Sequence, residues 1–223
     1  MTTDSVPAGG DPRALLADVN TLAYRVRRDQ RVTWVALLVL AAVTFVGIPA
    51  DWYGLDVNCV DNGCVFARKG VLLYWPPALL LAYGVIAYLY VRVARSRGLG
   101  ARVLPYTLAG VLLTALFAAA WVAAALYFPH HPVRFPEWVF VFDRLIAPWG
   151  TIGVGLLVLS RLERNIPLLI FTLGYLAVVL VPIDFGWGAH WGIKTAFLPQ
   201  QVINGTVLLL GAIGFALAGR RRR

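Results

Sequence analysis

The sequence has few charged residues, and almost none of them lie inside its longest apolar runs. Of 223 residues, 14% are charged and 60% are hydrophobic, and the mean hydropathy is +0.73. A soluble domain of this composition would expose large apolar patches to water, so the composition argues against a soluble protein. Several runs of about 20 residues carry almost no charge, and this length crosses the hydrocarbon core of a bilayer.

No Asp, Glu, Lys, Arg or His lies near the middle of these runs. Ionisable residues inside membrane spans mark ion and proton paths, so a transporter driven by a carboxylate relay is disfavoured. The main polar residues inside the runs are Thr44, Thr107, Thr114, Thr151, Thr172, Asn204 and Thr206. An apolar or amphiphilic solute could still bind among aromatic side chains, although such residues more often serve packing. The candidate aromatics are Tyr83, Tyr88, Trp121 and Tyr175.

Motifs of known chemistry are also absent. The chain has no glycine-rich phosphate loop, no Gly-x-Ser-x-Gly elbow and no His-Glu-x-x-His pair. No histidine lies mid-membrane to ligate a haem. We therefore expect no cofactor. The net charge of +9 does not indicate nucleic-acid binding, because the arginines fall between the apolar runs, where the positive-inside rule predicts them.

The apolar runs predict an all-α polytopic membrane bundle of six transmembrane helices. The expected spans are 33–49, 71–92, 104–128, 145–162, 166–183 and 200–219. With both termini inside, fifteen of the twenty basic residues lie on the inner side and five on the outer side. This bias predicts a multi-pass plasma-membrane protein with both termini in the cytoplasm. The predicted parts are a cytoplasmic segment (1–32), the transmembrane domain (33–219) and a basic tail (220–223).

The segment 12–30 is predicted to form an amphipathic helix. Asp11-Pro12 is a helix start signal, and an apolar stripe follows at spacings of three and four residues. Four basic residues could contact lipid head groups: Arg25, Arg27, Arg28 and Arg31. We expect this helix to lie on the inner membrane surface. The alternatives are a helix that packs under the protein's own bundle, or one that contacts a membrane or cytoplasmic partner protein.

The same region carries a family resemblance. Asp11-Pro12-Arg13-Ala14-Leu15-Leu16 leads to Arg25-Val26-Arg27-Arg28-Asp29-Gln30-Arg31 and then to the apolar runs. This arrangement resembles actinobacterial six-span integral membrane proteins whose activity is not characterised. The resemblance covers mostly the first fifth of the chain. It implies the bundle and a bacterial source, and it implies no activity.

The two cysteines lie in the segment Cys59-Val60-Asp61-Asn62-Gly63-Cys64. Asn-Gly favours a turn, so this segment can fold back and bring the two sulfur atoms together. On the predicted topology it faces the oxidising side, where disulfides persist, so we predict a structural disulfide. A catalytic thiol pair is the alternative, but the spacing exceeds Cys-x-x-Cys and no further cysteine could relay electrons. Free or metal-binding thiols are a third alternative.

An outer-face polar site is a weaker candidate. Ile48-Pro49-Ala50-Asp51-Trp52 resembles Val181-Pro182-Ile183-Asp184-Phe185, so Asp51 and Asp184 could form a carboxylate pair at an outer vestibule. The alternative is interface chemistry, in which proline ends the helix and aromatics anchor it. The histidines expected on the same side are His130, His131 and His190. They could bind zinc or copper, but no ligand spacing supports this, so we expect no metal.

The sequence thus predicts a membrane protein of non-enzymatic type. We expect an accessory or regulatory subunit, with 12–30 as its contact to a partner, or a small-solute permease-like module. The other hypothesis is a membrane thiol-disulfide redox enzyme that uses Cys59 and Cys64.

Overall fold

Six helices make up most of the structure. The computed structural model describes residues 33–60, 63–96, 104–127, 144–145, 147–181, 190, 192, 195 and 197–220, all within one unit, 33–223. The helices are α2 (Thr33–Tyr53), α3 (Lys69–Ser96), α4 (Leu104–Tyr127), α6 (Pro148–Glu163), α7 (Ile166–Leu180) and α9 (Leu198–Arg220). Each lies at one of the six predicted apolar runs, so the all-α class is confirmed. The predicted surface helix 12–30, with Arg25, Arg27, Arg28 and Arg31, lies outside the described residues.

The segment between the predicted spans 33–49 and 71–92 contains regular secondary structure. Helix α2 continues through Pro49 to Tyr53, and the N–H of Gly54 closes its last turn on the carbonyl of Ala50 at 3.0 Å. Two antiparallel strands follow, β1 (Leu55–Val60) and β2 (Gly63–Arg68). Proline lacks the N–H donor for one helical hydrogen bond, yet α2 continues four residues beyond Pro49.

Two glycines fix the base of this hairpin between α2 and α3. The N–H of Gly70 donates to the carbonyl of Gly54 at 3.2 Å. A Cβ atom on Gly54 would lie 2.4 Å from the backbone of Gly70, so only glycine permits this approach. The ion pair between Lys69 Nζ and Asp56 Oδ2, at 2.8 Å, lies beside them. The hairpin is therefore attached to the bundle at the ends of two helices.

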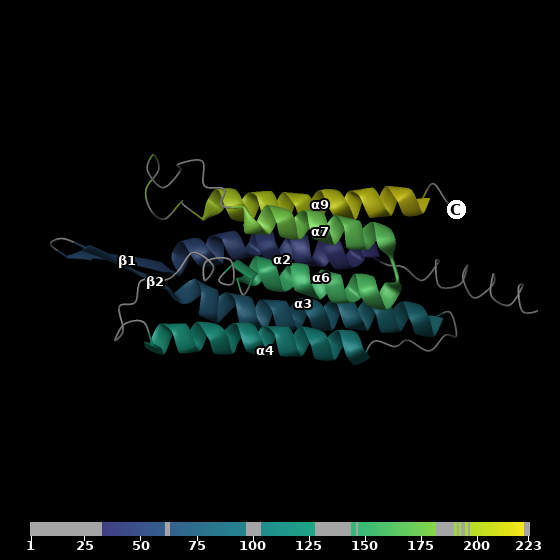
Figure 1. The fold of residues 1–223 in the computed structure, drawn as a ribbon, viewed down its shortest axis with the longest axis horizontal. Helices are drawn as coiled ribbons and strands as arrows, with labels where there is room; N and C mark the ends of the chain where they lie inside the picture. The colour runs from purple at the N-terminus through teal and green to yellow at the C-terminus, as the bar shows by residue number, and fades with distance from the viewer. Residues whose placement is uncertain are drawn as a thin grey trace, which may run out of the picture. The chain divides into compact units, whose positions relative to one another are not determined.

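The helices pack in a closed order, α2 beside α3, then α4, α6, α7 and α9, with α9 returning to α2 (Figure 1). Neighbours in the chain run in opposite directions. The ends where α2 finishes and α3, α6 and α9 begin lie together next to the hairpin, and we call this the hairpin end. The other end contains the end of α6, and we call it the Glu163 end.

Helix α6 is the most enclosed element. No residue from Pro148 to Ser160 is exposed. A Cβ atom on Gly155 would lie 2.6 Å from the hydroxyl oxygen of Tyr83, and this hydroxyl donates to the carbonyl of Thr151 at 3.2 Å. The glycines of this helix thus allow a large buried tyrosine to cross its surface, as expected for close helix packing.

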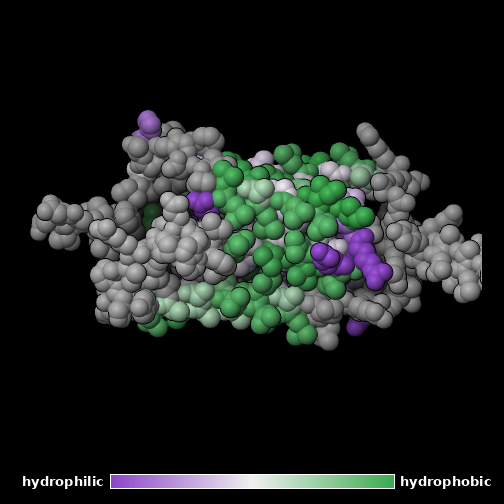
Figure 2. Space-filling model, viewed as in Figure 1, coloured by the Kyte–Doolittle hydropathy of each residue, from purple (hydrophilic) through white to green (hydrophobic). Residues whose placement is uncertain are grey.

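The outward faces of the other helices are apolar. Exposed leucines, isoleucines and valines occur along α3, α4, α7 and α9, and Figure 2 shows a hydrophobic surface over the middle of the bundle. Among the described residues, three helices are long and apolar enough to cross a membrane: α2, α9 and residues 69–93 of α3. Helices α4 and α7 contain shorter apolar segments, Leu108–Ala123 and Ile166–Leu180. These are features of a membrane protein.

Candidate functional site

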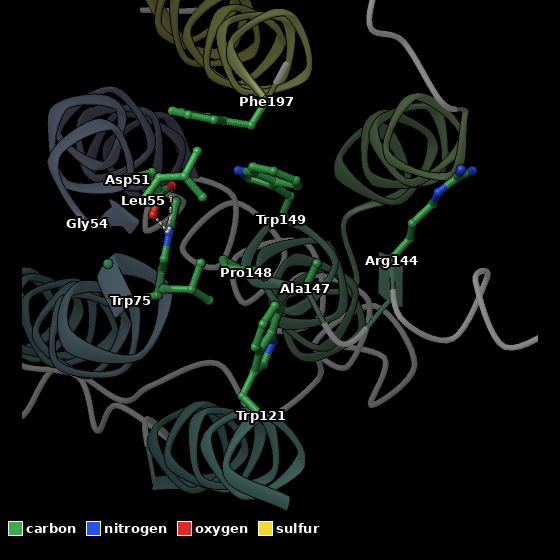
Figure 3. A pocket seen from close by; sticks show the side chains of 12 residues that line it. Asp51, Gly54, Leu55, Trp75, Trp121, Arg144, Ala147, Pro148, Trp149 and Phe197 are labelled. Atoms are coloured by element: carbon green, nitrogen blue, oxygen red, sulfur yellow. Dashed lines mark hydrogen bonds between the residues drawn. The ribbon is translucent and has the colours of Figure 1, made fainter. Parts of the chain in front are cut away.

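A cavity of about 90 Å³ lies at the hairpin end (Figure 3). Its walls come from the base of the hairpin and from the ends of several helices. Its aromatic lining consists of Trp75, Trp121, Trp149 and Phe197, and its ionisable residues are Asp51 and Arg144. The volume is enough for several ordered waters or one small solute. Largely apolar walls with a few polar groups are typical of small-molecule sites.

The carboxylate of Asp51 is held in the cavity wall by a tryptophan. The last turn of α2 carries Asp51, and the start of α3 carries Trp75, which is fully buried. The indole Nε1 of Trp75 donates to both carboxylate oxygens, at 3.2 and 3.1 Å. A hydrogen bond to a charged acceptor contributes about 1.5–3 kcal/mol. This bond therefore fixes both the carboxylate and the join between α2 and α3.

A second indole donor lies in the cavity, and it has no partner among the residues that the structure describes. The Nε1 atom of Trp149 is buried without a hydrogen bond among the described residues. Figure 3 shows the indole nitrogen directed toward the side of the cavity that carries Asp51. The ring is positioned by an edge contact with Trp75, with centroids 6.4 Å apart, and the carbonyl of Trp149 accepts from Tyr175 Oη at 3.3 Å. An unsatisfied buried donor costs about 1–3 kcal/mol, so a guest with an acceptor would be favoured here.

The guanidinium of Arg144 serves a different role. It donates through Nη1 to the carbonyl of Leu180, the last residue of α7. A cation at a helix C-terminus is favoured by the helix dipole and by the free carbonyls there. Figure 3 shows its head group pointing away from Asp51. The carboxylate in the cavity wall is thus not neutralised by this arginine.

The Glu163 end carries a carboxylate of another kind. The oxygens of Glu163 accept from Thr33 Oγ1 at 2.9 Å, from the hydroxyl of Tyr90, and from Asn165 Nδ2 at 3.4 Å. Thr33 and Asn165 are buried. One side chain at the end of α6 therefore connects α2, α3 and the start of α7. Glu163 lies in the short segment between the predicted spans 145–162 and 166–183, where no role was predicted for it. The sequence did indicate that this residue could have a role, because Glu163 is the single acidic residue between Arg161 and Arg164.

The predicted outer-face polar site is only partly described. Asp51 lines the cavity, and His190 is exposed. His130, His131 and Asp184 lie outside the described residues. Within the described ranges, no group of three His, Cys, Asp or Glu residues could hold a metal ion. The carboxylate pair of Asp51 and Asp184 stays a prediction.

The four candidate aromatics divide into three groups. Trp121 lines the cavity. Tyr83 and Tyr175 are fully buried in the core, where they pack between helices. Tyr88 is exposed on the apolar surface. Helical spacing could not separate these roles. Trp75 and Trp149 also line the cavity, and they were not among the predicted candidates, because tryptophans near the ends of apolar runs are typical of interface or packing residues.

The hairpin register places Cys59 directly opposite Cys64. Two residues connect Val60 to Gly63, which are themselves paired. In a two-residue hairpin the flanking pair is hydrogen-bonded, so the next pair is of the closer, non-hydrogen-bonded type, with Cα atoms about 4.5 Å apart. That separation lies within the range for disulfides, about 4.4–6.8 Å. The cysteine side chains lie outside what the structure describes, so the disulfide stays a prediction.

Comparison of the chain with protein-family models, with curated proteins and with solved structures finds no match. The resemblance to actinobacterial membrane proteins therefore stays a hypothesis, and the function is argued from the residues of the chain.

Proposed function

We propose that the chain is a six-span plasma-membrane protein that binds a small solute at its hairpin end, as a non-enzymatic permease-like or accessory module. The three long apolar helices and the apolar surface support the membrane setting. Helices α4, α6 and α7 complete six antiparallel crossings in this proposal. Helix α6 has no exposed residue from Pro148 to Ser160, so it needs less apolar surface than a helix that faces lipid.

The proposed orientation puts the Glu163 end and both termini in the cytoplasm. The arginine distribution supports it, because fifteen of twenty basic residues then lie inside. The hairpin end, with Asp51 and the cavity, faces outward. Two of the five outer basic residues have local partners: Lys69 pairs with Asp56, and Arg144 donates to Leu180.

The unpartnered indole N–H of Trp149 carries the proposal of a solute site. It lies in an aromatic cavity next to a fixed carboxylate. A solute with a hydrogen-bond acceptor would satisfy this donor, while its apolar part contacts the other tryptophans. Catalysis is not required by any of these features.

Native mass spectrometry of the gently extracted protein tests this function. We expect a small molecule to be retained by the wild type and lost in Trp149→Phe, which keeps an aromatic ring but removes the N–H donor. Trp52→Phe is the matched control, because Trp52 is exposed in the same region. Retention by Trp149→Phe at the wild-type level, or no retained molecule in either protein, would contradict the solute site.

The accessory-subunit form of the proposal concerns the segment 12–30. Removal of residues 1–30 is expected to release a co-purifying protein while the bundle stays folded. If the chain never retains a partner protein under mild solubilisation, the accessory-subunit proposal is wrong and the permease-like proposal is kept.

The redox enzyme remains the alternative function, because the register of Cys59 and Cys64 favours their pairing. The double change Cys59→Ala, Cys64→Ala separates the two roles. If the double variant loses protection from hydrogen exchange in β1 and β2, and the wild type shows no thiol exchange, the disulfide is structural. Loss of a substrate-linked or quinone-linked activity in a folded variant indicates the enzyme.

A further inference from the structure

A second set of unpartnered polar atoms lies deeper in the bundle, on the buried face of α9. Gln201 and Asn204 are both fully buried. Gln201 Nε2 donates to the carbonyl of Thr44 at 3.2 Å, but its Oε1 atom has no partner among the described residues. Both amide atoms of Asn204, Oδ1 and Nδ2, have no partner there either. Two neighbouring side chains thus present two free acceptors and one free donor group.

The threonines of the same interior show how unusual this is. The hydroxyl of Thr44 donates to the carbonyl of Leu40 at 2.9 Å, and the hydroxyl of Thr172 donates to the carbonyl of Leu168 at 2.8 Å. Each bond lies within one helix. A threonine can therefore be satisfied by its own backbone, whereas the amide of Asn204 needs a partner from outside its turn.

The two amides are close to each other and lie inward from the cavity. Residues three or four apart on a helix share a face, so Phe197, Gln201 and Asn204 follow one line along α9. Phe197 lines the cavity at the hairpin end. Gln201 Nε2 and the Trp75 ring lie 2.9 and 2.8 Å from the position of a Cβ atom on Gly47, so Gln201 lies next to the cavity's tryptophan wall.

We propose that Gln201 and Asn204 form an interior binding site for an uncharged hydrogen-bonding guest, either water or a small hydroxyl or amide solute. The guest donates to Asn204 Oδ1 and Gln201 Oε1 and accepts from Asn204 Nδ2. The helices that pack most on α9 are α2 and α7, and the middle of neither contains Asp, Glu, Lys, Arg or His. A charged guest would have no counter-charge there, so the guest is neutral.

Hydroxyl-radical labelling with mass spectrometry tests the site in the purified full chain, because a bound water allows labelling of a buried neighbour. Leu208 lies one turn beyond Asn204 and is fully buried, and Leu156 is a buried leucine on α6 for comparison. We expect Leu208 to be labelled at least several-fold more than Leu156. Asn204→Leu removes this labelling, whereas Thr206→Val, an exposed position on the same helix, leaves it unchanged.

Two added compounds, acetamide and tetramethylammonium chloride, test whether the guest is water, a small amide solute or a cation. If acetamide suppresses the labelling of Leu208, the site accepts a small amide solute, and if it does not, the guest is water alone. Equal labelling of Leu208 and Leu156, persistence of the labelling in Asn204→Leu, or suppression by tetramethylammonium chloride would overturn the proposal. Asn204→Ser, which replaces the amide with one hydroxyl that can donate to its own helix backbone as Thr44 and Thr172 do, is the second variant if Asn204→Leu does not fold, and we expect it to lower the labelling. The result does not depend on the solute site at Trp149.

Discussion

The two ends of the bundle each place one carboxylate among several helices, but they use it differently. At the Glu163 end the carboxylate accepts from Thr33, Tyr90 and Asn165, and the donors around it are satisfied. At the hairpin end the carboxylate of Asp51 accepts from one indole donor, while a second indole donor beside the cavity has no partner within the described part of the chain. One end is closed by its own side chains, and the other has room for a guest.

The difference follows from the residues that each end supplies. The Glu163 end is built from short polar side chains and one tyrosine, which can converge on a single acceptor. The hairpin end is built from tryptophans and glycine-lined backbone, and large rigid rings cannot fill every gap. We therefore expect substitutions at the Glu163 end to change stability, and substitutions at the hairpin end to change binding as well.

Glu163→Ala is expected to have the largest effect on stability. It removes the acceptor shared by Thr33 and Asn165, both buried, and by Tyr90. Loss of charge-assisted bonds with buried donors left unpaired costs about 3 kcal/mol. Thermal unfolding in detergent, followed by tryptophan fluorescence, should show a clear fall in Tm. Glu163→Gln, which keeps one acceptor oxygen and replaces the other with an N–H₂ donor, should lose less, and a Tm equal to that of the wild type would refute the role of the negative charge.

Trp75→Phe is expected to have the next largest effect, about 2 kcal/mol. It removes the hydrogen bond from the Trp75 indole to Asp51 and leaves a gap beside the cavity. The same unfolding measurement applies. Trp34→Phe, at an exposed position of α2, is the control and should change Tm little. If Trp75→Phe has the same Tm as the control Trp34→Phe, the hydrogen bond between Asp51 and Trp75 does not stabilise the hairpin end.

Arg144→Gln should cost about 1 kcal/mol, because it weakens the contact with the carbonyl of Leu180 at the end of α7. Hydrogen exchange should increase in the last turn of α7 and stay unchanged at the Glu163 end. Exchange that rises equally at both ends would show a general loss of packing instead.

The double change Cys59→Ala, Cys64→Ala is expected to have the smallest effect on the bundle. A disulfide that closes so short a loop stabilises it by about 2 kcal/mol, and this acts on the hairpin rather than on the helices. We expect faster hydrogen exchange in β1 and β2, with Tm almost unchanged. In the wild type, resistance of the thiols to alkylation before reduction checks the bond directly.

The helices could be predicted from the sequence because each is a long apolar run between polar segments. The hairpin was missed, although Leu55-Asp56-Val57-Asn58 alternates apolar and polar residues as a strand does. The turn was predicted at Asn62-Gly63, but Gly63 begins β2. Each strand has six residues, which is a short pattern. Between two predicted membrane spans such a segment is more readily interpreted as a loop.

The candidate site was less predictable. Asp51 was selected from its position, but its partner Trp75 is 24 residues away, and no local pattern encodes that contact. Asn204 was recognised as polar within a span, yet only packing shows that both of its amide atoms lack partners. Glu163 shows the same limit, because two of its three donors, Thr33 and Tyr90, lie far from it in the chain. Tertiary contacts set these roles.

The enclosure of α6 also has a consequence for biogenesis. None of its residues from Pro148 to Ser160 is exposed. In a membrane, this helix therefore needs less hydrophobicity than a helix that must enter the bilayer by itself. Only Arg164 and Asn165 separate it from α7, and Arg164 adopts the left-handed backbone conformation that makes so tight a reversal. In the proposed membrane setting, α6 and α7 would leave the translocon together as a pair, with the more apolar α7 carrying its partner into the lipid.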